Sequence, residues 1–260
     1  MMMPSLFISH GAPDLVLHDL PARRFLSGYG AELPAPSAIC VISAHYAGAQ
    51  PLVTTGPAPR TVHDFGGFDP ALYTLRYPAP GAPALAARLI AACADAGLQV
   101  FADAQGGFDH GVWCPLLLMY PAAAVPVVAL SVCPRRDAAW HFALGRALAP
   151  LRAEGVLVIG SGALTHNLYE VRPPAGFDEA PAWVDAFADW VGERLAAQDE
   201  AALLDYRTQA PHAADNHPSS EHLLPFHVAL GAAGPGWCAT RLHRSVTYRA
   251  LRMDAFRFDS

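Results

Sequence analysis

The sequence predicts an α/β fold: a single domain with a central, mostly parallel or mixed sheet flanked by helices. Three short apolar runs, each bounded by turn-forming residues, are typical of buried strands and cover residues 5–9, 39–45 and 156–159. Segments with helical periodicity alternate with the strand-like runs, which is typical of a parallel sheet. No stretch has the length or composition of an interdomain linker, so we expect residues 1–260 to form one domain.

The composition excludes several classes of protein and of chemistry. Hydrophobic residues make up 53% of the chain and charged residues 15%, which suits a packed core and argues against disorder. The net charge of -6 and the lack of a basic run argue against nucleic acid as a partner. All 17 basic residues are arginine, so there is no lysine to form a Schiff base or a Walker-type phosphate loop.

The chain has the sequence features of a cytoplasmic protein. Its apolar runs are too short to span a membrane, and the first four residues lead into a strand without a signal-peptide pattern, so no membrane partner is expected. The five cysteines are widely spaced and never form a C-x-x-C pair, which argues against a disulfide framework or a thiolate zinc site. We expect them to be small buried residues. Nothing in the sequence indicates an oligomeric state.

The first two strands each lead to a histidine. Residues 5–9 run into His10, and Gly11 gives the backbone freedom to turn beside this imidazole. A helix is expected over residues 20–31, and the strand at 39–45 then ends in His45. Open α/β sheets bind ligands at the carboxyl ends of their strands, so both histidines are candidate functional residues. A lone histidine at such a position is more often structural, and it gains weight only from its partners.

A long excursion rich in proline, glycine and aromatic residues covers residues 46–83. This length is unusual in a compact domain unless the loop has a function. Residues 61–68 place His63 and Asp64 beside aromatic residues and two glycines, so we expect a loop that covers a pocket. The alternative is a surface loop packed on its own aromatic side chains.

Another histidine lies between glycines, after a helix expected over residues 83–96 and a strand over 98–102. The glycines of segment 106–111 leave the backbone free to bring His110 close to a ligand. Asp109 could orient a metal-binding histidine by a hydrogen bond to the ring nitrogen that does not bind the metal. The alternative is a helix start at which Asp109 is the N-cap.

A further strand-helix-strand unit follows, with strands over 125–132 and 156–159 and a helix from its cap Asp137 to about residue 153. Gly160-Ser161-Gly162 comes directly after the second strand. Its spacing fits neither a dinucleotide fingerprint nor a nucleophile elbow. We expect these glycines to make room for substrate beside His166.

The last third of the chain supplies a further candidate ligand. A helix is expected over residues 182–197, a solvated polar segment over 206–219 that includes His212 and His217, and one or two closing strands within 245–258. Residues 219–224 resemble a capped helix start, with Pro225 in or near the first turn. Glu221 and His222 are adjacent, so on a helix they would point about 100 degrees apart and only one would reach a given metal.

Three strands that each lead to a histidine suggest one metal site. Histidine and carboxylate ligands without a thiolate suit a catalytic Zn, Fe(II) or Mn site with open positions, rather than a closed structural zinc site. Two reaction classes fit: hydrolysis by a metal-bound water, and oxygen chemistry at non-haem Fe(II). The residue pattern does not separate them.

Seven segments carry a resemblance over nearly the whole chain: ISHGAP (8–13), ISAHY (42–46), TVHDFGGF (61–68), YPAPG (77–81), GFDHG (107–111), THNL (165–168) and EHLLP (221–225). In order and spacing they resemble the 4,5-DOPA extradiol dioxygenase family, a branch of the class III extradiol ring-cleavage dioxygenases. One such segment is a weak signal, whereas the set is highly specific.

The resemblance implies roles for individual residues. It implies a metal held by His10, His45 and His222, with His166 beside it as catalytic acid/base or as a further ligand when substrate is absent. It also implies that His110 lines the pocket and bonds to substrate or dioxygen. The substrate pocket is expected to include His63, Asp64 and Asp109.

The resemblance further implies a substrate and a cofactor. The expected reaction is cleavage of a DOPA-like catechol by dioxygen to a ring-opened semialdehyde, with Fe(II) as the working metal and Zn(II) an alternative occupant in isolated protein. Many class III relatives use two histidines and a glutamate, and here both Glu221 and His222 are available, with the match favouring His222. Two alternatives stay open: a zinc-dependent hydrolase, and a non-enzymatic metal- or ligand-binding relative on the same fold.

Overall fold

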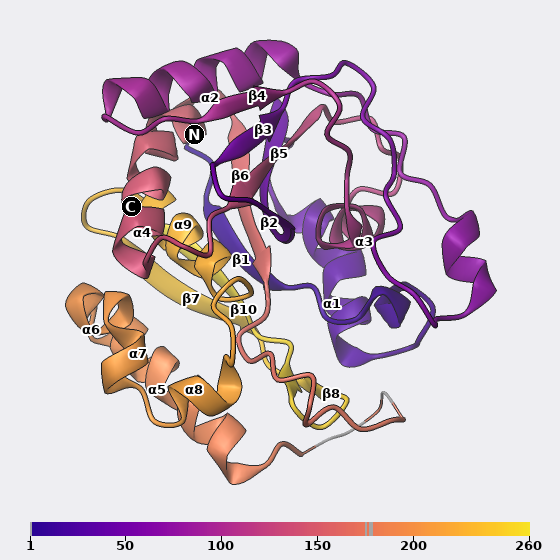
Figure 1. The fold of residues 1–260 in the computed structure, drawn as a ribbon, viewed down its shortest axis with the longest axis vertical. Coiled ribbons are helices and arrows are strands. Elements are labelled where there is room, and N and C mark those ends of the chain that lie inside the picture. The colour runs from indigo at the N-terminus through magenta and orange to yellow at the C-terminus, as the bar shows by residue number, and fades with distance from the viewer. Residues whose placement is uncertain (1, 175, 177–178) are drawn as a thin grey trace.

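A computed structural model describes residues 2–174, 176 and 179–260 of the chain. Within these residues, one eight-stranded mixed sheet forms the centre of the molecule and helices cover both of its faces (Figure 1). The predicted fold class, a single α/β domain around a mostly parallel or mixed sheet, is confirmed. In spatial order the strands are β4 (Phe101–Asp103), β3 (Leu52–Thr54), β5 (Val127–Val132), β2 (Ala38–Ala47), β6 (Val156–Gly162), β1 (Ser5–Ser9), β10 (Ala255–Asp259) and β7 (Cys238–His243).

The central strands β5, β2, β6 and β1 are parallel to one another. They are buried over almost their whole length, because helices pack on both faces of the sheet, and this explains why they read as continuous apolar runs. The register pairs Ser43 with Ser161, and Ser9 with Gly162. The carboxyl ends of β1, β2 and β6 therefore lie side by side, while β10 and β7 extend the sheet with antiparallel pairing.

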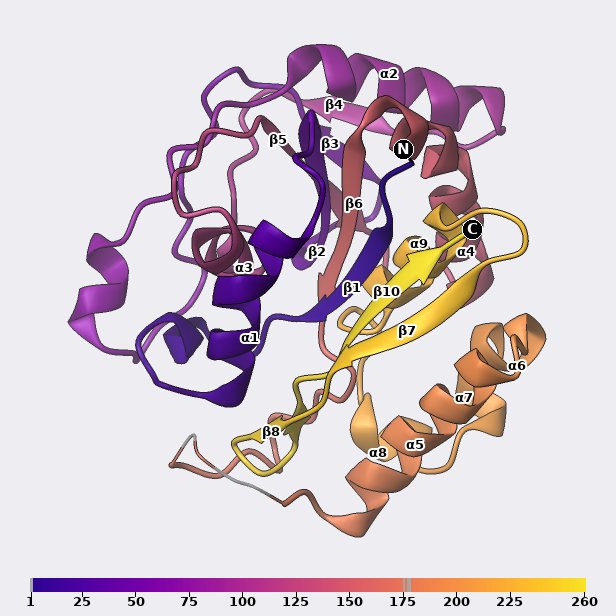
Figure 2. The same cartoon turned by 180° about the vertical axis from the view of Figure 1, so that it is seen from behind.

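Helices on the two faces divide the core. On one face, α3 (His110–Met119) packs against β2 and α1 (Pro21–Tyr29) packs on α3, and both helices share a buried cluster with Ile39 and Val41. On the other, α2 (Pro83–Asp95), α4 (Ala138–Leu148) and α9 (Leu224–Ala232) pack against Cys40 and Ile42. None of the helices in the described part of the chain is long and apolar enough to cross a membrane. Beside β7 lie α5 (Ala182–Ala196) and the short helices α6 (Glu200–Leu204), α7 (Tyr206–Gln209) and α8 (Ala213–Asn216) (Figure 2).

Most predicted helices are found at the expected positions. The helices expected at 20–31, 83–96 and 182–197 are α1, α2 and α5. The helix expected from Asp137 to about residue 153 is α4 followed by a 3-10 helix, and the Asp137 side chain accepts a hydrogen bond from the backbone N–H of Trp140. Gly155 then ends the turn with a φ of 83°. The 3-10 helices are Pro13–Val16, Gly30–Glu32, Pro70–Thr74 and Ala149–Glu154.

Several short elements differ from the prediction. The excursion at 46–83 contains β3, whose three residues are too few to show a periodic pattern, and the strand expected at 98–102 is β4, which begins at Phe101. The edge strand β7 was not predicted, because its sequence mixes polar and apolar residues. The closing segment forms β10 together with a separate ribbon of β8 (Val246–Thr247) and β9 (Leu251–Arg252). The helix expected from residue 219 begins at Leu224, with Pro225 in its first turn.

Two predictions about exposure are wrong for individual side chains. His217 is fully buried, because its Nε2 lies 2.9 Å from the carbonyl oxygen of Leu164 and its ring packs against Phe187. His212 is exposed, as expected. Four of the five cysteines are buried, whereas Cys238 on the edge strand is exposed.

Candidate metal centre

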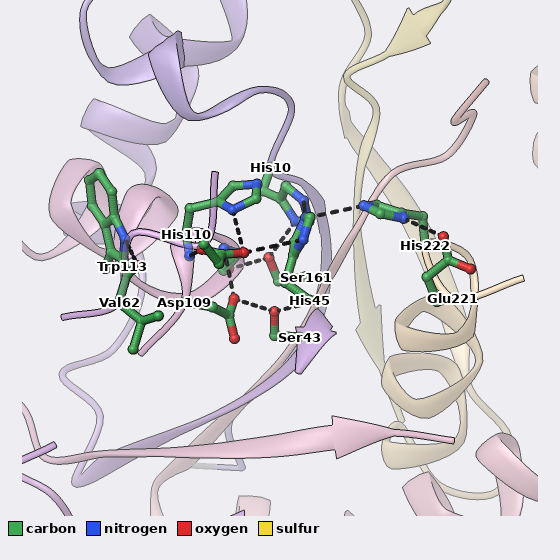
Figure 3. Close-up of polar contacts among 12 residues, drawn as sticks. His10, Ser43, His45, Val62, Asp109, His110, Trp113, Ser161, Glu221 and His222 are labelled. Carbon is green, nitrogen blue, oxygen red and sulfur yellow. Dashed lines mark hydrogen bonds and ion pairs between the residues drawn. The ribbon is translucent and has the colours of Figure 1, made fainter. Parts of the chain in front are cut away.

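Three histidine side chains from distant parts of the chain converge beyond the carboxyl ends of the central strands (Figure 3). His10 directly follows β1, His45 lies near the end of β2, and His222 lies in the turn before α9. The Nε2 atom of His45 is 3.0 Å from Nε2 of His10 and 3.2 Å from Nε2 of His222. The structure therefore brings together the three residues that the resemblance implies as ligands.

Each of these rings has a partner for its other nitrogen. The Nδ1 of His10 lies 3.0 Å from the hydroxyl oxygen of Ser161, and because that hydroxyl donates to the carbonyl of Gly111, it accepts from His10. The Nδ1 of His222 lies 3.2 Å from Glu221 Oε1, and the Nδ1 of His45 lies 3.4 Å from Asp64 Oδ2. With the ring proton held on Nδ1, each Nε2 presents a lone pair to the shared space.

The donor set fits a divalent transition metal. Burial is the largest cause that lowers the pKa of His10 and His222 well below its usual value, and neighbouring histidines lower it further. Burial and His110 lower the pKa of His45 to about 3. The rings are therefore neutral at physiological pH, which is the form that binds metal. Three converging lone pairs repel one another unless a cation lies between them, and imidazole nitrogens suit Zn and Fe.

Two glycines of β6 allow the His222 turn to approach the sheet. A Cβ atom on Gly160 would lie 2.1 Å from the carbonyl oxygen of Pro225, and one on Gly162 would lie 2.1 Å from that of His222. The prediction that these glycines make room for substrate is therefore wrong. They make room for the backbone of the turn that carries His222.

His166 and His110 lie against the three converging rings. The His166 ring stacks on the His222 ring, with centroids 3.4 Å apart and planes 8° apart. The backbone N–H of His166 donates to the carbonyl of Asn216, which fixes this loop. Burial lowers the pKa of His166 to about 4, so its ring is neutral at pH 7. His110 is the first residue of α3, and its ring centroid lies 3.8 Å from that of His45.

A cavity of about 210 Å³ opens beside these rings. Its walls are mostly apolar, and its polar side chains are those of His45, His110, His166 and Asp64. A planar aromatic ring could lie between its walls with its polar substituents toward the histidines. The lining residues are Gly11, Ala12, Pro13, His45, Asp64, Phe65, Phe68, His110, Ala163, His166, Leu168 and Leu251.

The structure brings Asp64 to this cavity but does not bring His63 or Asp109 to it. His63 packs among aromatic side chains, with its Nε2 3.1 Å from the carbonyl oxygen of Leu75. Asp109 is buried behind the site as the N-cap of α3, the alternative reading of this residue, and burial raises its pKa to about 6. It accepts hydrogen bonds from the Ser43 hydroxyl and the Gly111 N–H, so of these two aspartates it is Asp64 that contacts the histidine rings.

Sequence reasoning missed the two serines behind the site. Ser161 holds the His10 ring, and Ser43 holds Asp109 and lies beside Ser161 in the register of β2 and β6. The available signal was their position, since both lie near the carboxyl ends of strands that lead to candidate ligands. Phe65, Phe68 and Leu168 belong to motifs noted in the sequence, but nothing local indicated that they share one cavity.

Comparisons with known proteins agree with this arrangement. Residues 27–252 match the family described as the catalytic LigB subunit of aromatic ring-opening dioxygenase. The chain is 41% identical to the 4,5-DOPA dioxygenase extradiol of Beta vulgaris, a match that covers 98% of this chain and 96% of the relative. It is 42% identical to the Escherichia coli K12 protein of the same name, covering 88% of this chain and 85% of the relative.

A solved structure has the same fold. The crystal structure of an uncharacterized protein from Escherichia coli K12 superposes with a TM-score of 0.81 at 34% identity, covering 98% of this chain and 99% of that one. A family match over most of the chain, together with relatives at this level of identity, decides between the reaction classes that the sequence pattern left open. The chain belongs to the family of the catalytic LigB subunit of aromatic ring-opening dioxygenases, and it is an enzyme of the oxidoreductase class.

Proposed function

We propose that this enzyme opens the ring of a DOPA-like catechol with dioxygen, by extradiol cleavage at a non-haem metal, to give a semialdehyde. The observation that carries the proposal is the convergence of three neutral Nε2 atoms beside a ring-sized apolar cavity that two further histidines line. Relatives named 4,5-DOPA dioxygenase extradiol support the choice of substrate class.

The proposed ligands are His10, His45 and His222. His222 is preferred to Glu221, because the carboxylate lies on the Nδ1 side of the His222 ring, behind the converging nitrogens. Fe(II) is the metal proposed for activity, and Zn(II) is an alternative occupant of the same nitrogen donors in isolated protein. When bound, Fe(II) would supply the electron transfer between catechol and dioxygen that their different spin states otherwise block, which redox-inactive Zn(II) would not.

His166 is the proposed acid/base. Its neutral ring lines the cavity and stacks on His222, so it can take a proton from a catechol hydroxyl at this end of the cavity and later return it to an oxygen. His110 lines the same cavity and is proposed to hydrogen-bond the substrate or dioxygen. The aromatic and aliphatic walls, with Phe65, Phe68 and Leu168, would hold the catechol ring in place and exclude water.

The remaining proposals concern the context of the reaction. We infer one catalytic domain over residues 1–260 and a cytoplasmic location, with small molecules as the partners and neither nucleic acid nor membrane. The competing activity that the residue pattern left open, zinc-dependent hydrolysis, would work without dioxygen, and the family match favours oxygen chemistry over it.

The test is dioxygen uptake by protein loaded with Fe(II) under anaerobic conditions and then given a panel of catechols that includes DOPA. Uptake matched by formation of the yellow semialdehyde is the expected result. A folded, iron-saturated protein that consumes no dioxygen with any member of the panel contradicts the proposal. Zinc-loaded protein assayed anaerobically against ester and amide substrates tests the competing activity.

A further inference from the structure

The 61–68 segment is held rigidly against the start of α3. The Val62 N–H donates to the Phe108 carbonyl at 2.7 Å, the Phe108 N–H donates to the Arg60 carbonyl at 2.8 Å, and the indole N–H of Trp113 donates to the Val62 carbonyl at 3.0 Å. A Cβ on Gly107 would lie 2.6 Å from the Arg60 carbonyl oxygen, so only glycine permits this approach. These contacts fix the backbone directly before Asp64 against the start of α3.

The Asp64 carboxylate contacts two histidines at once. Its Oδ1 accepts the backbone N–H of His110 at 2.9 Å, and its Oδ2 lies 2.9 Å from His110 Nδ1 and 3.4 Å from His45 Nδ1. A carboxylate accepts hydrogen bonds, so the His110 ring directs an Nδ1–H toward it. The same oxygen lies 3.4 Å from the Nδ1 of His45 and favours a proton on that nitrogen as well.

We infer that Asp64 is a positioning residue that sets the ring orientation and tautomer of both His45 and His110. This inference rests on the proposed metal centre, since it treats His45 as a ligand. With its proton held on Nδ1, His45 presents Nε2 to the metal and His110 presents Nε2 to the substrate cavity. A carboxylate behind a ligating histidine also makes its metal-binding nitrogen more basic.

One carboxylate thereby couples the ligand set to the substrate-binding face. The two rings pack directly on each other, with centroids 3.8 Å apart, so a rotation of either ring would move the other. The sequence pattern pointed to Asp109 for such an orienting role, but the Asp109 side chain accepts its hydrogen bonds from the Ser43 hydroxyl and the Gly111 N–H at the helix start. Nothing in the proposed reaction requires Asp64 to touch the substrate.

The main experiment compares Asp64→Asn with Asp64→Glu and with a matched control, Asp69→Asn. Asp69 is an exposed residue of the same excursion that caps a 3-10 helix. Asparagine keeps the size but directs an amide N–H₂ or an uncharged oxygen at the rings. We expect metal affinity to fall by about 10- to 100-fold in Asp64→Asn. At saturating metal, kcat should still be reduced at least about 10-fold with KM changed less, and Asp64→Glu should recover part of both losses.

Each outcome decides a part of the inference. Wild-type affinity and kcat in Asp64→Asn would overturn it. A wild-type kcat in Asp64→Asn at saturating metal would overturn the inference that Asp64 orients His110. Asp64, His45 and His110 also lie close enough to hold a metal themselves, as do His166, Glu221 and His222. Two metals per chain in the wild type and one in Asp64→Asn would make Asp64 a ligand and overturn the inference.

A second measurement uses wild-type protein, so its result does not depend on whether the Asp64 variants fold. In zinc-loaded wild-type protein labelled with ¹⁵N, the imidazole nitrogens of His110 are assigned by their loss in His110→Gln. A ring protonated at Nδ1 supports the inference, and a bare Nδ1 overturns it. Neither this spectrum nor the metal affinity depends on ring cleavage, so a wild-type enzyme that fails to cleave catechols would refute the proposed function alone.

Discussion

At the scale of single residues, the three proposed ligands are neutral imidazoles, and the outer nitrogen of each lies against a polar partner. Ser161 holds His10, Glu221 holds His222 and Asp64 faces His45. The roles of these rings therefore depend on which nitrogen carries the proton, and the outer partners decide this.

His166 is expected to be needed for turnover more than for metal binding. Because positioned acid/base catalysis contributes about 10²- to 10⁴-fold, His166→Ala should keep most of its metal and lose kcat by roughly that factor. Metal content and steady-state kinetics measure the two quantities on the same sample, with His212→Ala, an exposed imidazole, as the control. Loss of metal in proportion to activity would instead make His166 a primary ligand.

Ser161 is expected to matter for metal affinity through His10. Ser161→Ala removes the acceptor for the His10 Nδ1–H, so affinity should fall by about 10- to 100-fold, as measured by competition with a chromophoric chelator. The control is Ser5→Ala, another buried serine of the sheet, whose hydroxyl donates to the Ala229 carbonyl. Equal affinity in the two variants would mean that the Ser161 bond does not orient His10.

At the scale of elements, the site depends on how closely the turn before α9 approaches β6. The carbonyl groups of His222 and Pro225 come to within 2.1 Å of where Cβ atoms would lie on Gly162 and Gly160. The parallel register of β1, β2 and β6 brings His10 and His45 together. The two glycines leave space for the turn that carries His222.

Gly162→Ala should disturb both folding and the metal site. The added methyl would collide with backbone, so we expect a loss of about 1–3 kcal/mol in the free energy of unfolding, together with weaker metal binding. Gly28→Ala is the control: Gly28 lies in α1 with no atom within 4 Å of an added Cβ, and alanine there should stabilise the helix by up to about 1 kcal/mol. Urea titration and chelator competition measure the two effects, and an unchanged Gly162→Ala would refute the packing argument.

At the scale of the whole molecule, buried neutral histidines make stability depend on pH. His141 is fully buried; its Nδ1–H donates to the Asp137 carbonyl at 2.8 Å, and its Nε2 accepts the Cys133 N–H at 3.1 Å. Burial lowers its pKa to about 4. The folded-state pKa thus lies below the unfolded value of about 6.5, so the unfolded chain binds the proton more readily.

His141 should contribute about 3 kcal/mol to the free energy of unfolding, at 1.36 kcal/mol per pKa unit. This contribution should be present above pH 6.5 and lost as the pH falls toward 4. Urea unfolding of metal-free protein at several pH values between 7 and 4 measures the slope. His141→Gln keeps one donor and one acceptor but does not titrate, so its slope should be shallower than that of wild type. Identical slopes would show that His141 does not titrate between these limits.

The sequence by itself determined the fold class, the parallel centre of the sheet and the five histidines that the structure brings together. These features are local: an apolar run bounded by turn residues predicts a buried strand, and the residue after it lies at the ligand-binding end of the sheet. The strand β3 escaped because three residues carry no periodicity, and β7 escaped because its sequence mixes polar and apolar residues.

Only the tertiary structure decided the partners of these side chains. It placed Asp64, and not Asp109, against the histidine rings, buried His217, and assigned the glycines of β6 to the approach of another backbone. The His45 and His222 nitrogens that lie 3.2 Å apart belong to residues 177 positions apart in the chain. Contacts over such separations depend on the packing of whole elements, because no local pattern encodes which side chain a distant segment will bring to the site.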